Sequence, residues 1–588
     1  MNEALQAAAR DLISPEALTE TVAYLCSLGE KVSGSDEEEK ACDYITGKLR
    51  EYGYEPVVHR FDSYLSYPRS AALRVGGPDG YDLPCVGVAF GTSTPEGGFT
   101  AEVVLVGSGS EAEYEGKDVA GKIVLVTKLP SPGNSVAAAA KGAKGMICMS
   151  AGKQRHKMTI TPVWGTPEFD QAKDIPRLHL VSISKTDGDR ILANLAKGRV
   201  EATIVTDVFE GWRSVRLPVA EIKGEEPLFS LVGAHYCSWF DGSTDNITGD
   251  ACVLELARVL KQFEGKLRHG LRFAWWPGHS HARYSGSTWY ADTFWHDLHE
   301  NAITYFNIDS PGVKGATVYV PRHQMAELSA YNEKTTKDVT GWTTLNSSNA
   351  QLALGKRKDK YVSPTRPSRA GDQSFWGVGV TSLAVYSMLT PEDENRDLNV
   401  GGSGGAWWWH SEHETFDKYS PEVLSQDARL YATILLGLST ADVLPFDPAA
   451  IAGDYLDSLR EFEEAAGEHL PIAELTEETR LLKARLEALR ASASKQAIDK
   501  NESARMNRLF LRISRLLNPV LYQSGSDFHH DPALGSRALP SLSPALTLSK
   551  LSNDSDTYRF TRVGLLRRMN RIRHQLRETS RLLAESGY

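Results

Sequence analysis

The sequence has 588 residues, which is too long for one hydrophobic core and predicts several folding units. Its 41% hydrophobic and 24% charged residues are ordinary for a globular protein, and its formal net charge of -10 argues against a nucleic acid or an anionic membrane as partner. No apolar run reaches the roughly 20 residues that span a bilayer, and the N-terminus lacks the pattern of a signal peptide. We therefore expect a cytoplasmic protein.

The first predicted elements are an amphipathic helix and a β-rich stretch. Ser35 precedes an acidic turn, and apolar residues then recur at helical spacing up to Gly53, which predicts a capped helix between them. From about Tyr67 the sequence changes to short β-like runs separated by Gly and Pro, followed by an Ala-rich helix near residues 134–150. We interpret residues 67–222 as an inserted domain.

Apolar strands alternate with helices after residue 222. This pattern predicts a mostly parallel sheet covered by helices on both faces, formed by residues 1–66 and 223–444. Ligands of such sheets bind beyond the carboxyl ends of the strands. Beyond about Pro445 the sequence is charged and has helical periodicity, which predicts a helical domain over residues 445–588.

Five segments of the chain carry potential metal ligands. In chain order they hold His235 and Cys237, Asp245, His279 and His281, Asp309, and His410 and His413. Imidazole and carboxylate groups are the usual ligands of zinc and similar divalent ions, and a bridging carboxylate lets two ions share a nucleophilic water. A single histidine is more often a surface or core residue. Several of them near the ends of consecutive strands favour a metal site.

The motifs resemble those of the zinc aminopeptidase and glutamate carboxypeptidase superfamily, which also includes the transferrin receptor. The resemblance rests on the opening VSGSDEEEKACDYITGKLREYGY and on the ordered segments GAHYCSW, GSTDNITG, GHSHARYSGS, NIDSPG and HSEHETFDKYS. GKIVLV and AAAAKGAKGMI resemble the protease-associated domain that is inserted in many members. LLNPVLYQSGSDFHHDP resembles the helical domain of the transferrin receptor branch.

The resemblance implies an α/β fold of the phosphorylase/hydrolase-like aminopeptidase type. In this fold a mostly parallel mixed sheet is sandwiched by helices, with a β-rich protease-associated insertion and a C-terminal helical domain that serves dimerisation. His235 matches the first histidine ligand, Asp245 the bridging aspartate, Asp309 the carboxylate ligand after the third strand, and His410 the final histidine ligand.

Two positions depart from the family pattern. Cys237 replaces an aspartate that orients the first histidine, so it is a candidate ligand or supporting residue. The family's Glu-Glu pair, counted back from Gly286, is here Ser280 and His281. We expect His281 to replace the second Glu as a ligand, whereas Ser280 cannot replace the first as general base. His279 is then either a substitute base or an additional ligand.

Residues near the end of the α/β part could shape a substrate pocket. The resemblance assigns Asp372 and Phe375 to the segment that lines this pocket, and Trp276 and Trp409 cluster around the same motifs, although large aromatic side chains also fill cores. Arg366 and Arg369 could hold a substrate carboxylate or be solvated.

The residues after His410 allow two interpretations. We expect both His413 and Glu414 to lie in a solvated helix start, and keep His413 as a candidate for the metal or its surroundings.

Three functions are compatible with the sequence. The first is a metal-dependent hydrolase that cleaves an amide or peptide-like bond of a small substrate or peptide, with one or two divalent ions, zinc being expected. The second is a metal-dependent lyase or other non-peptidase enzyme on the same fold. The third is a non-catalytic binding protein like the transferrin receptor. In each case we expect a homodimer formed through the helical domain.

Overall fold

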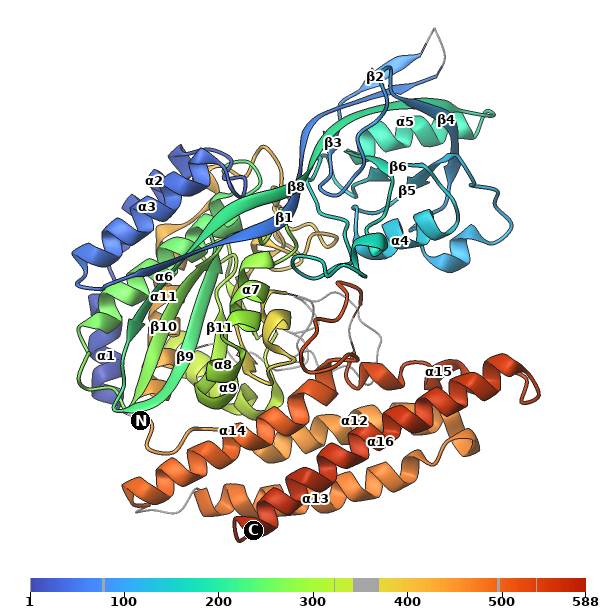
Figure 1. Cartoon of the computed structure of the whole chain (residues 1–588). Helices are drawn as coiled ribbons and strands as arrows, with labels where there is room; N and C mark the ends of the chain where they lie inside the picture. Colours follow the sequence, from blue (N-terminus) through green and yellow to red (C-terminus); the bar gives the residue numbers. More distant parts are fainter. Residues whose placement is uncertain (1, 77–79, 322, 342–369, 494–497, 536) are drawn as a thin grey trace.

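The computed structural model describes the chain except residues 1, 77–79, 322, 342–369, 494–497 and 536. Its described residues form three parts: an α/β part, a β-rich part above it and a bundle of long helices below (Figure 1). Within these residues we find no helix whose length and apolar character would let it cross a membrane.

The centre of the α/β part is a set of parallel strands. They are β9 (Glu226–His235), β10 (His269–Trp276), β11 (Ala302–Asn307) and β13 (Thr381–Leu383), in the order β13-β11-β9-β10. Neighbouring pairs within this set are parallel, which confirms the predicted sheet. A separate antiparallel pair is formed by β12 (Val318–Pro321) and β14 (Val385–Met388).

Helices cover both faces of these strands. The α/β part contains α1 (Glu3–Leu12), α2 (Pro15–Ser27), α3 (Asp36–Glu51), α6 (Thr248–Lys261), α7 (Ser285–Thr293), α8 (Trp295–Asn301), α9 (Ala326–Thr340) and α11 (Pro421–Ser439). Because side chains alternate along a strand, Phe273 and Trp275 of β10 join the core formed with α6 and α11, whereas Ala274 and Trp276 join the core formed with α7 and α8. Burial of both faces explains the continuous apolar runs of the sequence.

Two long antiparallel strands lead from the α/β part into the β-rich part. These are β1 (Val57–Val75) and β8 (Glu201–Ile222), and β8 also pairs with β10. The predicted domain boundaries at residues 66/67 and 222/223 fall inside β1 and at the end of β8. The β-rich part adds β2 (Tyr81–Leu83), β3 (Val86–Gly87), β4 (Phe99–Leu105), β5 (Ile123–Val126), β6 (Gly145–Met149), β7 (His179–Ile183), α4 (Pro132–Ala140) and α5 (Lys185–Leu195).

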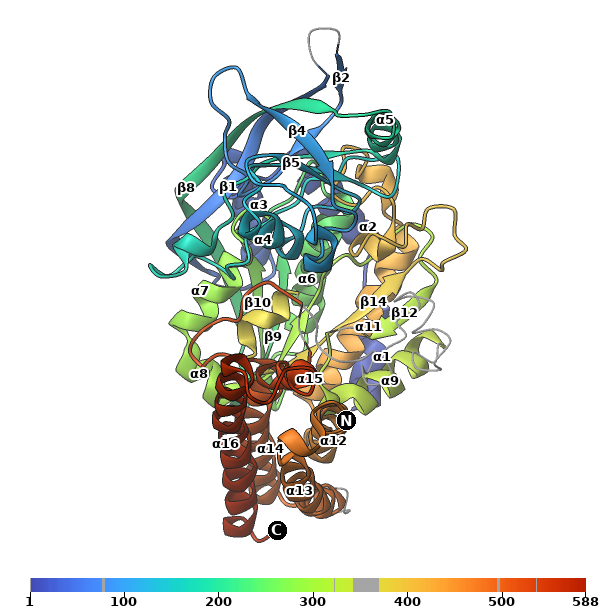
Figure 2. The ribbon, with the colours of Figure 1, turned by 90° about the vertical axis from the view of Figure 1, so that its right-hand side faces the viewer.

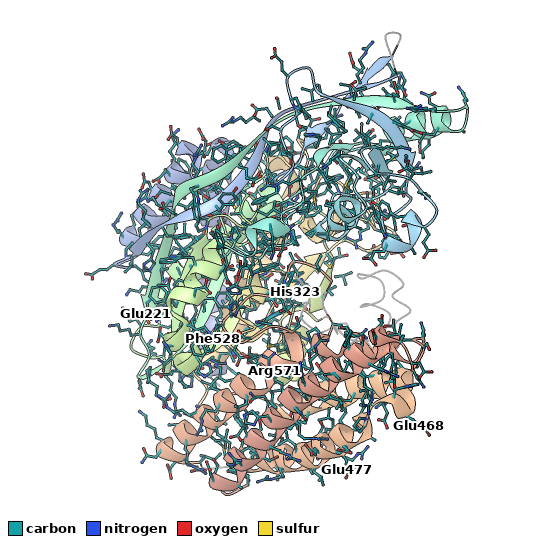
Figure 3. All side chains as sticks on the ribbon, turned by 45° about the vertical axis from the view of Figure 1, so that its right-hand side comes forward. Glu221, His323, Glu468, Glu477, Phe528 and Arg571 are labelled. Atoms are coloured by element: carbon teal, nitrogen blue, oxygen red, sulfur yellow. The ribbon has the colours of Figure 1, made fainter. Side chains whose placement is uncertain are left out.

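The C-terminal part is helical, as the periodicity of its sequence predicts. Its helices are α12 (Pro448–Ala466), α13 (Ile472–Ala493), α14 (Lys500–Tyr522), α15 (Ala545–Leu548) and α16 (Asp556–Glu585), and the long ones lie side by side (Figure 2). Arg515 of α14 is buried and donates hydrogen bonds to the carbonyls of His299 (2.8 Å) and Gly379 (2.7 Å). Arg571 of α16, which lies near Phe528 in Figure 3, forms an ion pair with Asp527 at 2.7 Å.

Candidate metal centre

A cavity of about 290 Å³ lies beyond the carboxyl ends of the parallel strands. Six of the residues predicted from the sequence line it: Asp245, His279, Ser280, Asp309, Trp409 and His410. The β-rich part contributes Ser131, Met158 and Thr159 to the same wall. The cavity is therefore shared between two parts of the chain.

His235, the last residue of β9, faces two carboxylates. Its Nδ1 donates a hydrogen bond to the carbonyl of Cys237 at 2.9 Å, which leaves a lone pair on Nε2. The buried Nε2 lies 2.9 Å from Asp245 Oδ1 and 3.7 Å from Asp309 Oδ1, yet forms no hydrogen bond to any described residue. Burial lowers the pKa of His235, but Asp245 and Asp309 raise it well above its usual value. A lone pair facing carboxylates requires a cation, either a proton or a metal ion.

The same arrangement occurs at His410. Its Nδ1 donates to the carbonyl of Lys157 at 2.9 Å, and its Nε2 lies 3.1 Å from Asp245 Oδ2. Trp409 Nε1 also donates to Asp245 Oδ2, at 2.5 Å. Burial alone would raise the pKa of Asp245, but His235 and His410 lower it well below its usual value. Asp245 thus presents one oxygen to each histidine, which is the geometry of a bridging carboxylate.

His279 completes a group of potential ligands. One ligand atom each from His235, His279 and Asp309 lie within 4.8 Å of one another. The imidazole rings of His279 and His235 stack at 3.7 Å. Burial, and then the charge of His235, hold the pKa of His279 well below its usual value, so its imidazole is neutral. A neutral imidazole can donate its lone pair to a metal ion or accept a proton.

His281 lies elsewhere, which corrects its predicted place in the ligand set. It is fully buried, and its Nδ1 lies 3.4 Å from both the amide nitrogen and the hydroxyl of Ser33. The prediction counted back along the sequence and assumed the backbone path of the family. In the structure Arg283 and Tyr284 have φ values of 44° and 69°, and this turn brings His279 rather than His281 to the cavity.

Ser280 and Cys237 lie next to each other at the edge of the site. Ser280 lines the cavity and its backbone N–H points to Cys237 Sγ at 3.5 Å. Cys237 is fully buried and is not among the residues that line the cavity. Burial raises the pKa of its thiol, but His235 and His281 lower it well below the usual value. Cys237 therefore lies outside the cavity, where its carbonyl orients His235.

Glu414 is a functional candidate that the sequence analysis placed wrongly in a solvated helix start. It is fully buried, and its carboxylate accepts 2.7 Å hydrogen bonds from the backbone N–H of His410 and from the hydroxyls of Ser403 and Thr244. Burial raises its pKa to about 8. By contrast, His413 is half exposed, and its Nε2 lies 3.9 Å from the carboxylate of Glu412, outside the ligand cluster.

Three of the four predicted substrate-binding residues lie in the core. Trp276 and Phe375 are buried, with ring centroids 6.1 Å apart, and Asp372 is buried and accepts a hydrogen bond from Trp376 at 3.0 Å. Because aromatic residues at strand ends fill cores as readily as pockets, the sequence could not separate the two roles. Trp409 does line the cavity.

The structure adds two basic residues to the cavity wall, Arg283 and His323. Figure 3 shows His323 near the middle of the molecule, and its Nδ1 lies 3.9 Å from Asp372. Arg283 lies within the segment GHSHARYSGS, where attention went to the histidines, and His323 lies outside the motifs, so neither residue was predicted. Arg366 and Arg369 lie outside the described residues.

Comparison with known proteins agrees with this architecture. Residues 219–435 match the model of peptidase family M28, and residues 99–191 match that of the PA domain. An aminopeptidase of Bacillus subtilis is 27% identical over 63% of this chain and 78% of its own length. A probable glutamate carboxypeptidase of Zea mays is 25% identical over 50% of this chain, and the chain spans only 50% of the maize protein's length. The solved structure of a zinc aminopeptidase from Bacillus subtilis, 21% identical, superimposes with a TM-score of 0.53 over 72% of this chain and 94% of its own.

Proposed function

The chain belongs to peptidase family M28, with an inserted PA domain, and on this premise we propose that it is a metal-dependent hydrolase. The substrate is a small molecule or peptide, and the scissile bond is an amide or peptide-like bond. The observation that carries the proposal is the pair of histidine Nε2 atoms that face the two oxygens of Asp245. Two imidazole nitrogens that face the same carboxylate form a set of donors suited to a divalent cation.

We assign the ligands in two groups. His235, His279 and Asp309 would hold one ion, and Asp245 would bridge it to a second ion at His410. Zinc suits this mixture of imidazole and carboxylate ligands, and a similar solved structure is that of a zinc aminopeptidase. When bound, such an ion supplies Lewis-acid chemistry: it polarises a carbonyl and acidifies water.

The chain's own residues orient the candidate ligands. Glu414 fixes the backbone of His410, and the carbonyls of Cys237 and Lys157 fix the tautomers of the two histidines. A neutral imidazole has one lone pair, so His279 cannot bind a metal and accept a proton at once; its place among the ligands favours the metal. Because Ser280 cannot act as a base, we expect hydrolysis slower by about 10²–10⁴-fold than with a carboxylate base.

The experiment is to remove metal with a chelator and to restore zinc, cobalt or manganese while amide and peptide substrates are screened in water labelled with oxygen-18. The proposal predicts cleavage that is lost on chelation, returns with metal and places one labelled oxygen in the product. Metal-dependent turnover without label would instead favour a lyase, which the missing glutamate base makes the second candidate. Protein that binds no metal would favour a non-catalytic binding protein.

We further infer a homodimer that uses the C-terminal helices. On α16 the side chains of Phe560 and Val563 are 73% and 46% exposed, and two apolar residues one turn apart on a long helix suit a contact between subunits. Sedimentation of the full chain should give a dimer at micromolar concentration. A monomer would contradict this inference.

A further inference from the structure

Arg283, in the cavity wall, is hydrogen-bonded to the β-rich part through both its backbone carbonyl and its guanidinium. The backbone N–H of Gly165 donates to the carbonyl of Arg283 at 2.6 Å, and the guanidinium of Arg283 donates to the carbonyl of Thr159. Arg283 is only 6% exposed and lines the same cavity as the candidate metal ligands. A guanidinium stays protonated at any accessible pH, so this wall carries a fixed positive charge.

The backbone of the turn that carries this charge is strained. Arg283 and Tyr284 are consecutive residues with φ values of 44° and 69°, a conformation that L side chains rarely adopt. The Tyr284 ring stacks on Trp164 of the β-rich part at 4.0 Å and contacts the edge of His279 at 4.1 Å. These contacts hold the turn that carries Arg283 against the β-rich part. Strain of this kind persists where the surroundings over-determine it, and it concentrates at functional sites.

Thr159 supplies a second polar group to the wall. Thr159 is 9% exposed and lines the cavity, and its hydroxyl has no hydrogen-bond partner among the described residues. A buried hydroxyl without a partner costs free energy, which a ligand that accepts its hydrogen bond would recover. The carbonyl of this same residue receives the guanidinium of Arg283, so the two donors are neighbours.

Aromatic side chains complete the cavity. Trp239, Tyr284, Tyr386 and Trp409 line it together with Met158. Flat apolar surface beside a cation and a hydroxyl is suited to a group that is apolar at one end and anionic at the other.

We propose that Arg283 and Thr159 bind a carboxylate of the substrate, and that the substrate is an amide or peptide that carries this carboxylate next to an apolar or aromatic group. The guanidinium fork matches the planar carboxylate, and the threonine hydroxyl donates to one of its oxygens. That this ligand is a substrate rests on the proposed hydrolase function. The binding of the carboxylate itself does not depend on turnover.

The test uses the full chain after chelator treatment, so that no metal ion can attract the anion. Benzoate and its neutral isostere benzamide are titrated into the protein, with tryptophan fluorescence or calorimetry as readout. We expect benzoate to bind at least about tenfold more tightly than benzamide, since a charge-assisted hydrogen bond is exchanged for a neutral one. This comparison requires no variant. Equal affinities, or no binding of benzoate up to its solubility limit, would overturn the proposal.

Variants locate the effect. Arg283→Gln should abolish the preference for benzoate, and the nearly isosteric Thr159→Val should reduce it severalfold; thermal unfolding of each variant checks that it folds. Arg177→Gln is the matched control, because Arg177 lies exposed on the same β-rich part and pairs with Glu210. An unchanged preference in folded Arg283→Gln and Thr159→Val would place the carboxylate elsewhere. If instead benzoate binds as expected and no amide is hydrolysed, the proposed function fails while this site stands.

Discussion

The strand-end side and the turn side of the candidate metal centre are built differently. On the strand-end side, His235 is the last residue of β9. The parallel pairing of β9 with β10 and β11 fixes its position. On the turn side, His279 and Arg283 belong to a turn before α7 whose path depends on two residues at positive φ. This turn is also held by hydrogen bonds from the β-rich part.

The difference assigns separate roles to the two sides. A parallel sheet places side chains beyond its carboxyl edge whatever the loops do, so the strand-end side suits a general metal-binding function. The turn side depends on contacts between two parts of the chain and carries Ser280 and His281, where the sequence analysis expects a Glu-Glu pair. We therefore expect changes on the strand-end side to abolish function and changes on the turn side, apart from the candidate ligand His279, to alter it.

The largest expected effect is that of Asp245→Asn on the strand-end side. The amide removes the charge that faces both His235 and His410, so hydrolysis should fall by at least about a thousandfold, because Lewis-acid catalysis contributes several kcal/mol. Turnover and metal content are measured together. Asp554→Asn, at an exposed carboxylate, is the control. Full activity in Asp245→Asn would break the comparison.

A second change separates the core from the cavity wall. Phe375→Ala should lower the free energy of unfolding of the α/β part by about 3–5 kcal/mol, because it leaves a cavity in a packed core, while KM changes little in the folded protein. Trp409→Phe should raise KM and change the free energy of unfolding little, since Trp409 lines the cavity and donates to Asp245. Chemical unfolding measures the effect on stability, and KM measures the effect on substrate binding. A raised KM with unchanged stability in Phe375→Ala would return this residue to the pocket.

A third change tests the support of His410. Glu414→Gln keeps the shape of the side chain but weakens its hydrogen bonds to the backbone of His410 and to two hydroxyls. We expect metal affinity to fall by about 10–100-fold, the usual effect of removing a group that orients a ligand. Glu412→Gln, at a surface residue paired with Arg155, is the matched control. Equal affinities in the two variants would show that Glu414 has no such role.

The smallest expected effect concerns Asp427, a buried carboxyl that is not among the candidate metal ligands. Asp427 accepts hydrogen bonds from the amide of Gly312 and the hydroxyl of Ser387, and burial raises its pKa from 3.8 to about 7. Between these two values the unfolded chain releases the proton and the folded chain keeps it, so stability falls as pH rises through this window. Asp427→Asn should flatten this part of the pH dependence of Tm. An unchanged slope would contradict the assignment.

The sequence predicted the fold and the strand-end side for a physical reason. Alternating apolar strands and helices leave few arrangements, and residues that follow such strands must meet at one edge of the sheet, as His235 and Asp309 do. The turn side could not be predicted, because spacing along the chain says nothing of the positive φ values of Arg283 and Tyr284. Nor did the sequence reveal that Glu414 is buried, since the contact with Thr244, 170 residues away, appears only in the folded chain.

The most direct measurement is the metal content of two variants prepared side by side, His279→Ala and His281→Ala. The two histidines are two residues apart, but only His279 lies with His235 and Asp309, whereas His281 is buried against Ser33. We predict that His279→Ala loses bound metal and that folded His281→Ala retains it at the level of the unchanged protein. Retention by His279→Ala together with loss by His281→Ala would contradict the account.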